Sequence, residues 1–207
     1  MRYFKHILLT ALLVAVFAVP QGASAAITST GFTQIVGQVE EGPGQQLVLW
    51  QGNIVGDDTF VLDAIEVTLS DMAAGATGFA GSDLSFVTIH KEGDGTALVD
   101  GNGFDSGDDQ SVGSKAGGGI SAGNAFLIPV GGDLQPGAAP TGYYIVATIS
   151  PDAVVGHKFK YSLSTTAIKT LTAPGGTAGA TSPNPEVTAT DDANTVEIIS
   201  STGTVEI

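Results

Sequence analysis

Short apolar runs and turn clusters alternate along most of this 207-residue chain. Residues 157–163 show the pattern most clearly, because Phe159, Tyr161 and Leu163 alternate with polar residues. After residue 25, apolar residues are not sustained at helical spacing, and Gly, Thr, Ser and Val dominate instead. These patterns predict an all-β protein, an antiparallel β-sandwich of the immunoglobulin-like or jelly-roll-like kind.

Two runs, 47–50 and 143–149, are apolar on both faces and are therefore expected in the middle of a sheet. The run 60–69 changes the parity of its apolar positions halfway, which predicts a β-bulge near Asp63. Pro129 lacks a main-chain donor and therefore places its strand at a sheet edge. The remaining expected strands are 27–39, 84–91, 125–130, 157–163 and 167–171.

The first 25 residues have the pattern of a secretory signal peptide, expected as a signal helix. Arg2 and Lys5 precede an apolar run at 7–19, and the Ala-Ser-Ala of residues 23–25 is a small-residue cleavage site. The apolar run is short for a membrane span. Cleavage would leave Ala26 as the N-terminus, and an uncleaved N-terminal anchor is the alternative.

The chain is strongly acidic, since 21 Asp and Glu residues against seven Lys and Arg give a formal charge of −14. Loss of Arg2 and Lys5 with the signal peptide would lower the charge by two, to −16. Such a charge repels nucleic acids and anionic lipids and attracts divalent cations. The absence of cysteine excludes disulfides, thiol catalysis and cysteine-ligated zinc. No second apolar run of spanning length follows, so we expect a secreted, extracellular or cell-surface protein, with the periplasm as an alternative.

The order of the sequence segments along the chain predicts a sandwich domain followed by a tail. Residues 26–171 are expected to form the sandwich, and the Pro/Gly/Ala/Thr-rich residues 172–194 a linker or long loop. In 195–207 the tetrapeptide Thr-Val-Glu-Ile then occurs twice, at 195–198 and 204–207. The repeat favours a terminal β-hairpin, and a strand that pairs with the sheet edge of a neighbouring molecule is the alternative.

An acidic segment, residues 92–109, is the main candidate for chemistry. It holds six carboxylates, one Asn, five glycines and no basic residue. Hard oxygen ligands on a tightly turning backbone are what calcium requires, so we predict a calcium site there. The predicted ligands are Asp94, Asp100, Asn102, Asp105 and Asp108. The alternative is a solvated acidic loop that binds nothing.

The spacing of these ligands is not that of an EF-hand. If the loop begins at Asp100, its fifth position is Phe104, where a ligand is required, and its sixth is Asp105, where glycine is required. The segment is therefore expected to order a connection between two strands.

Signals for catalysis are weak. Residues 119–123 match Gly-x-Ser-x-Gly, but a glycine run precedes the match and a strand follows it, whereas a nucleophile elbow joins a strand to a helix. His90 and His157 are the histidines that follow the signal peptide. Neither has a second histidine at zinc-ligand spacing, and His157 is expected at the surface or a strand edge.

Three aromatic residues offer an alternative binding function. Trp50, Tyr143 and Tyr144 could line a platform for a sugar, although their strands are expected in the middle of the sheet, which favours core packing. A carbohydrate-binding module and a secreted hydrolase are therefore the alternatives to a non-catalytic protein.

The order of elements also resembles a known family. A strand at 85–90 precedes an Asp/Gly/Asn-rich insert ending in Phe-Asp-Ser-Gly-Asp at 104–108, and a Phe/Ile-rich strand and Tyr-Tyr-Ile-Val-Ala at 143–147 follow. Across 47–163 this resembles immunoglobulin-like β-sandwich modules of bacterial secreted and cell-surface proteins. The insert departs from theirs in lacking the full series of spaced aspartates. The resemblance implies a non-catalytic role in surface layers, adhesion or filaments. We thus expect a secreted structural or adhesive protein that is calcium-stabilised and self-associates or binds cell-surface components.

Overall fold

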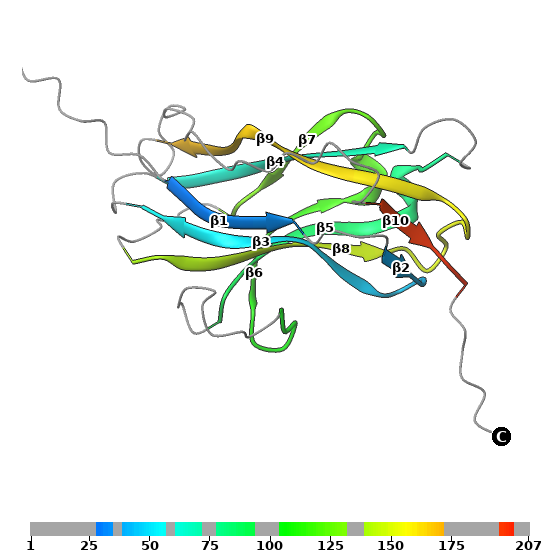
Figure 1. Cartoon of the computed structure of the whole chain (residues 1–207), viewed down its shortest axis with the longest axis horizontal. Helices are drawn as coiled ribbons and strands as arrows, with labels where there is room; N and C mark the ends of the chain where they lie inside the picture. Colours follow the sequence, from blue (N-terminus) through cyan, green and yellow to red (C-terminus); the bar gives the residue numbers. More distant parts are fainter. Residues whose placement is uncertain are drawn as a thin grey trace, which may run out of the picture.

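The computed structural model describes residues 28–34, 39–56, 61–71, 78–93, 104–131, 139–171 and 195–200. Their strands form two five-stranded sheets that stack as two layers (Figure 1). This arrangement confirms the predicted all-β sandwich. The expected signal helix lies outside the described residues. No helix in the described part of the chain is long and apolar enough to span a membrane.

The first sheet is antiparallel throughout, and its central strand is buried on both faces. In spatial order its strands are β1 (Thr28–Gln34), β3 (Gln46–Val55), β8 (Thr141–Ile149), β5 (Leu84–Lys91) and β6 (Gln110–Ala116). Every β8 residue is buried except Thr148, which is half-buried. The prediction that 143–149 form a central strand is therefore confirmed.

The second sheet combines strands from distant parts of the chain. In spatial order they are β2 (Val39–Glu41), β10 (Thr195–Ile198), β9 (Lys158–Leu171), β4 (Val61–Asp71) and β7 (Ala125–Pro129). β10 runs parallel to β2, and the other pairs are antiparallel. β10 is thus paired along both edges, which does not fit the expected hairpin between 195–198 and 204–207. A hairpin partner would need one of these edges. Residues 204–207, and the expected linker at 172–194, lie outside the described residues.

Two details of the second sheet test the predicted strand irregularities. The register between β4 and β9 shifts between Leu62 and Ala64, which confirms the predicted bulge near Asp63. The expected strands 157–163 and 167–171 are instead one strand, β9, with a second register shift opposite β4 between them. Pro129 ends β7, the outermost strand of its sheet, as predicted.

Two short 3-10 turns, η1 (Gly81–Asp83) and η2 (Gly117–Gly119), lie against each other. The first directly precedes β5 and the second directly follows β6. They pack so tightly that a Cβ atom on Gly117 would lie closer than 3.0 Å to the carbonyl oxygens of Leu84 and Gly81. Only glycine fits there without a backbone shift. The sheets also meet at one corner, where the Gly131 N–H donates to the Val112 carbonyl at 2.7 Å.

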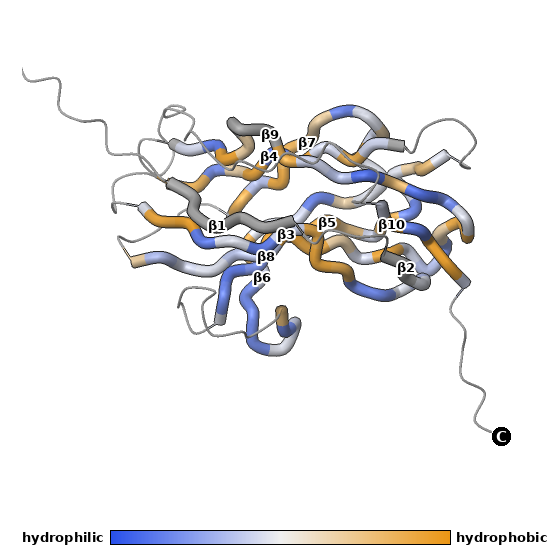
Figure 2. The backbone as a smooth tube through the Cα atoms, viewed as in Figure 1, coloured by the Kyte–Doolittle hydropathy of each residue, from blue (hydrophilic) through white to orange (hydrophobic). Residues whose placement is uncertain are grey.

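The core lies between the layers and is rich in aromatic residues. Trp50 meets Tyr161 edge-on at a centroid distance of 4.9 Å, and Phe79 packs on Phe159 at 4.8 Å. Hydrophobic residues follow the central strands, whereas β6 at the rim of the first sheet is mainly hydrophilic (Figure 2). Burial of these side chains is the main stabilisation in a chain without disulfides.

Candidate functional site

The acidic segment connects β5 to β6, two neighbouring antiparallel strands of the first sheet. The structure describes its two limbs, Glu92–Gly93 at the start and 104–109 at the end. The limbs touch, because a Cβ atom on Gly93 would lie closer than 3.0 Å to the Asp108 carbonyl. The base of the segment is therefore a narrow neck in which glycine is required at 93.

The buried carboxylate of Asp109 ties the two limbs together. Its Oδ1 accepts a hydrogen bond from the Gly93 N–H at 3.2 Å, and its Oδ2 accepts one from the Asp105 N–H at 2.8 Å. The Asp109 N–H in turn donates to the Asp105 carbonyl at 2.8 Å. We call this set the Asp109 clamp. The sequence indicated an acidic residue before β6 but not this role, because its partner Gly93 lies 16 residues away.

An aromatic contact joins the clamp to the outer face of the first sheet. The Phe104 ring meets His90 at a centroid distance of 4.8 Å and Tyr144 at 5.6 Å. His90 and Tyr144 are paired neighbours on β5 and β8. The Tyr144 hydroxyl donates to Glu92 Oε2 at 2.7 Å. The loop thus covers Tyr144 on the outer face of the first sheet.

His90 is part of the same support. Its Nδ1 lies 3.4 Å from the Asp109 carbonyl oxygen, and its Nε2 lies 3.0 Å from Thr88 Oγ1. The ring is largely buried. Both ring nitrogens therefore face protein oxygens, so the structure gives His90 a positioning role in the loop.

The predicted calcium ligands are only partly described. Asp105 uses Oδ1 to accept the Gly107 N–H at 2.8 Å in a local turn, and Asp108 is exposed. Asp94, Asp100 and Asn102 lie outside the described residues. Within the described ranges no three His, Asp or Glu side chains are grouped to hold a metal ion. Calcium binding therefore stays a prediction.

Beside the clamp, the outer face of the first sheet is hollowed. The hollow has a volume of about 680 Å³ and lies between the acidic loop, the turn before β3 and the end of β8. Its lining residues are Gly44, Gln45, Gln46, Phe104, Asp105, Ser106 and Thr148. Amide, hydroxyl and carboxylate groups surround one aromatic ring there, which suits a polar ligand. Sequence analysis did not single out Gln45, Gln46 or Thr148, because no motif marks them.

The aromatic platform predicted from Trp50, Tyr143 and Tyr144 is not formed. The exposed fractions of these residues are 0%, 1% and 0%. Trp50 and Tyr143 belong to the core between the sheets, whereas Tyr144 faces the opposite side of the first sheet beneath Phe104. A sugar ring needs an accessible aromatic face, so this alternative is wrong for these residues, and core packing is what the structure shows.

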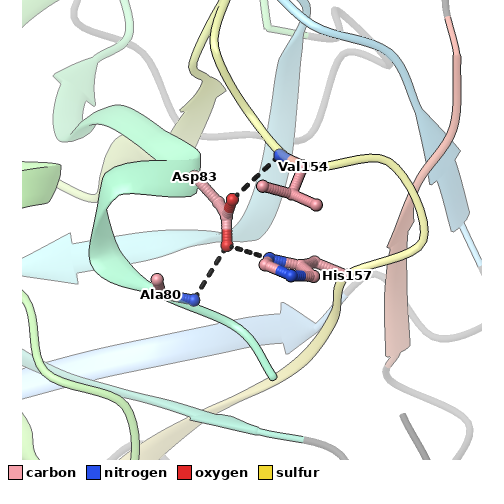
Figure 3. A network of polar contacts seen from close by, with 4 residues as sticks. All are labelled: Ala80, Asp83, Val154 and His157. Atoms are coloured by element: carbon pink, nitrogen blue, oxygen red, sulfur yellow. Dashed lines mark hydrogen bonds and ion pairs between the residues drawn. The ribbon is translucent and has the colours of Figure 1, made fainter. Parts of the chain in front are cut away.

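A second polar network, centred on Asp83, lies where β4 leads into β5. Asp83 is 1% exposed. Its Oδ2 lies 2.7 Å from His157 Nδ1 and accepts the Ala80 N–H at 2.8 Å, while Oδ1 accepts the Val154 N–H at 3.0 Å (Figure 3). The Asp83 carbonyl also accepts the Ser150 N–H at 2.8 Å. We call this network the Asp83 latch. His157, expected at the surface or a strand edge, is thus a partly buried partner of a carboxylate directly before β9.

The Asp83 latch reaches the last described strand. The Ile198 N–H donates to the His157 carbonyl at 3.0 Å, and the Gly156 N–H donates to the Ile198 carbonyl at 2.7 Å. The turn that carries His157 is therefore held by Asp83 on one side and by the end of β10 on the other.

Neither histidine belongs to a hydrolytic constellation in the described part of the chain. No hydroxyl group there is hydrogen-bonded to His157, and the hydroxyl near His90 belongs to Thr88, which itself donates to the Val146 carbonyl at 3.3 Å. Ser121 of the Gly-x-Ser-x-Gly match lies in an exposed turn between η2 and β7, with no helix after it. A nucleophile elbow requires that helix.

Comparisons with known proteins leave the family open. No protein-family model and no curated protein matches the chain. Among solved structures, it is similar to the sixth cohesin from scaffoldin B of Acetivibrio cellulolyticus, solved in complex with a mutant Cel5 dockerin. The match has 13% sequence identity and a TM-score of 0.28, and it covers 82% of this chain and 99% of the cohesin chain.

Proposed function

We propose that this chain is an exported, non-catalytic β-sandwich with a structural or adhesive role outside the cell. The observation that carries the proposal is the Asp109 clamp. By linking Gly93 and Asp105, the clamp holds the base of the acidic loop against the first sheet. A preorganised surface favours binding, because little conformational entropy is lost when a partner docks.

The polar groups of the described chain support a binding role over catalysis. The buried carboxylates Asp83 and Asp109 both accept main-chain N–H groups and hold loops in place. His157 is paired with Asp83, and both ring nitrogens of His90 have protein neighbours. These side chains act in the architecture, and the outer hollow offers contact groups instead of a nucleophile and its base.

Export is supported by the sequence. The N-terminal pattern is that of a signal peptide, and the acidic, cysteine-free composition suits a protein outside the cell that attracts divalent cations. Calcium bound by Asp94, Asp100, Asn102, Asp105 and Asp108 would neutralise the repulsion among carboxylates beyond the clamp. The partners would be further copies of the chain or components of the cell surface.

Sedimentation velocity and cell fractionation test the proposal. We expect the chain beginning at Ala26 to associate in a concentration-dependent way or to bind envelopes of the producing cells, and calcium to strengthen either behaviour. Asp109→Ala should weaken binding, and Asp152→Ala, which removes an exposed carboxylate outside the acidic loop, is the control for charge. A strict monomer with no envelope binding, with and without calcium, would contradict the proposal.

A second candidate function is recognition of a carbohydrate in the outer hollow. It is favoured by the amides of Gln45 and Gln46, the hydroxyl of Thr148 and the Phe104 ring around one open volume. A glycan array on the full mature chain tests this, with Gln46→Ala as the binding variant and the exposed Gln110→Ala as the control. If the chain binds no polysaccharide on the array, this candidate function is wrong.

A further inference from the structure

The strand β10 fills a well-defined slot in the second sheet. It lies between β2 and β9 at one end of the sandwich (Figure 1). Val196 and Ile198 are fully buried in the core, and Thr195 is 2% exposed. Between them Glu197 points outward and forms an ion pair with Lys158 at 2.6 Å. The slot therefore selects for a small buried polar residue, an aliphatic residue, an acid and a second aliphatic residue.

Residues 204–207 repeat the occupant of this slot, Thr-Val-Glu-Ile, nine positions further along the chain. Val205 and Ile207 correspond to the two buried aliphatic residues, and Glu206 corresponds to the acid that pairs with Lys158. Every side chain that the slot contacts in β10 is thus present in the second copy. The main-chain bonds to β2 and β9 do not depend on side-chain identity.

The second copy has no free edge on β10 of its own molecule. β10 is paired with β2 on one side and with β9 on the other. Five residues, 199–203, join the two copies. Residues 204–207 therefore cannot pair alongside β10, and their sequence, which is identical to that of the occupant, suits the same slot in another molecule.

We propose that residues 204–207 of one molecule occupy the β10 slot of a second copy of this chain. The proposal rests on the proposed function and specifies its self-association. The incoming strand has the same four residues as the displaced one, so contacts in the slot are conserved. The balance between closed and exchanged forms is then set by concentration and by the entropy of the connecting segments. Each molecule offers one slot and one strand, so the assembly is head-to-tail.

The displacement is favoured by the long connection before β10. β9 ends at Leu171 and β10 begins at Thr195, so 23 residues, 172–194, separate the two strands. A long connection holds its strand at a lower effective concentration than a tight turn does. Replacement by an identical strand from outside therefore competes with the resident strand.

Three full-length variants test the exchange. The first carries Val196→Asp and Ile198→Asp, the second carries Val205→Asp and Ile207→Asp, and the third carries all four changes. A matched control, Ser201→Asp with Thr202→Asp, adds the same two charges outside both tetrapeptides. Melting is followed by Trp50 fluorescence, and association by sedimentation velocity over a hundredfold range of concentration.

The expected results separate slot occupancy from assembly. The first variant should melt well above the third, because residues 204–207 can fill the empty slot. The second should melt like the wild type but associate at least tenfold more weakly, while the control associates normally. Equal melting of the first and third variants would overturn the proposal, since the second copy would not fit the slot.

Other outcomes distinguish this proposal from the function proposed above. If the wild type associates and the second variant associates equally well, the strand exchange is wrong while self-association stands. If the wild type is a monomer that binds cell envelopes, exchange between molecules is likewise wrong and surface attachment stands. A wild type that neither associates nor binds envelopes contradicts both.

Discussion

The carboxylate of Asp83 and the imidazole of His157 meet at 2.7 Å between Oδ2 and Nδ1, although the residues are 74 positions apart in the chain. Asp83 lies before β5 of the first sheet, and His157 lies before β9 of the second. The contact therefore joins connections that belong to the two different layers of the sandwich. The Ile198 N–H donates a hydrogen bond to the His157 carbonyl, so the contact between Asp83 and His157 also positions the end of β10.

Replacement of Asp83 by alanine is expected to destabilise the protein strongly. The change leaves the N–H groups of Ala80 and Val154 without their acceptor and removes the partner of His157. Leaving such donors without an acceptor costs about 1–3 kcal/mol each in unfolding free energy. Urea unfolding monitored by the single tryptophan, Trp50, measures the loss.

Asp152 provides the control for this experiment, because it is exposed on the turn held by the latch. Asp152→Ala removes the same charge and is expected to change the unfolding free energy by less than about 0.5 kcal/mol. If both variants unfold at the same urea concentration as the wild type, the latch does not stabilise the fold.

Replacement of Asp109 by alanine should loosen the base of the acidic loop without unfolding the sandwich. Two N–H groups, of Gly93 and Asp105, lose their acceptor, which costs about 1–3 kcal/mol. The amide hydrogens of these residues should exchange faster, while those in β8 stay protected. In calcium-free buffer, Asp108→Ala, which removes the exposed neighbouring carboxylate, should leave the exchange of both amides unchanged.

The contact between η1 and η2 predicts opposite behaviour for two adjacent glycines. Gly117→Ala forces a Cβ atom against the Leu84 and Gly81 carbonyls and should destabilise the protein by about 1–3 kcal/mol. Gly118→Ala meets no atom within 4 Å and should be neutral or slightly stabilising. Thermal melts of the two variants are the measurement, and equal melting temperatures would show that the turns do not pack as described.

Much of the strand pattern was predictable from the sequence because it is local, whereas β6 and the division of 27–39 into β1 and β2 were not predicted. Alternation and parity depend on neighbouring residues, which is why β8 was recognised as central and Asp63 as the site of a bulge. The position of Pro129 at a sheet edge follows from its own missing N–H.

The contacts that hold the loops were not predictable, because their partners are distant in the chain. Asp83 reads as one more acidic residue at the end of a glycine-rich loop, and nothing near it in sequence indicates His157. Likewise Thr195–Ile198 reads as half of a hairpin, whereas tertiary pairing inserts it between β2 and β9. For the acidic loop, composition indicated the place but not the role of Asp109.

Alkaline pH should destabilise the core through two tyrosines. Burial raises the pKa of Tyr143 and of Tyr161 to about 12, from an ordinary value of 10. The folded protein therefore holds these protons more tightly than the unfolded chain. Their contribution to stability is complete below pH 10 and is lost as the pH rises toward 12. The slope is about 1.4 kcal/mol per pH unit for each tyrosine.

This effect is isolated by measuring the unfolding free energy between pH 9 and 12 for the wild type, the two single variants and the double variant. Tyr143→Phe and Tyr161→Phe should each reduce the alkaline loss of stability, and the double variant should reduce it most. Lysines also titrate in this range, but they are the same in all four proteins, so differences in slope report the tyrosines. Identical slopes in the wild type and the double variant would contradict the assignment.

The acidic loop should make thermal stability depend on calcium. The clamp holds Gly93 against the Asp108 carbonyl, so the loop between the limbs starts and ends at one place. Asp94 directly follows Gly93 in the sequence, and Asp105 and Asp108 lie in the other limb, so we expect these carboxylates to share one ion. An ion that binds only the folded state raises stability by about 2.7 kcal/mol at a hundred times its Kd.

Melting of the mature chain in calcium, in magnesium and in chelator measures this dependence. Calcium should raise the melting temperature more than magnesium does. Magnesium is the control for screening of the negative charges by a divalent cation. Asp100→Asn with Asp105→Asn should abolish the difference, whereas Asp191→Asn with Asp192→Asn, an acidic pair outside the loop, should preserve it. Superimposable melts of the unaltered chain in calcium and chelator would rule out the calcium site and leave the Asp109 clamp to hold the loop by itself.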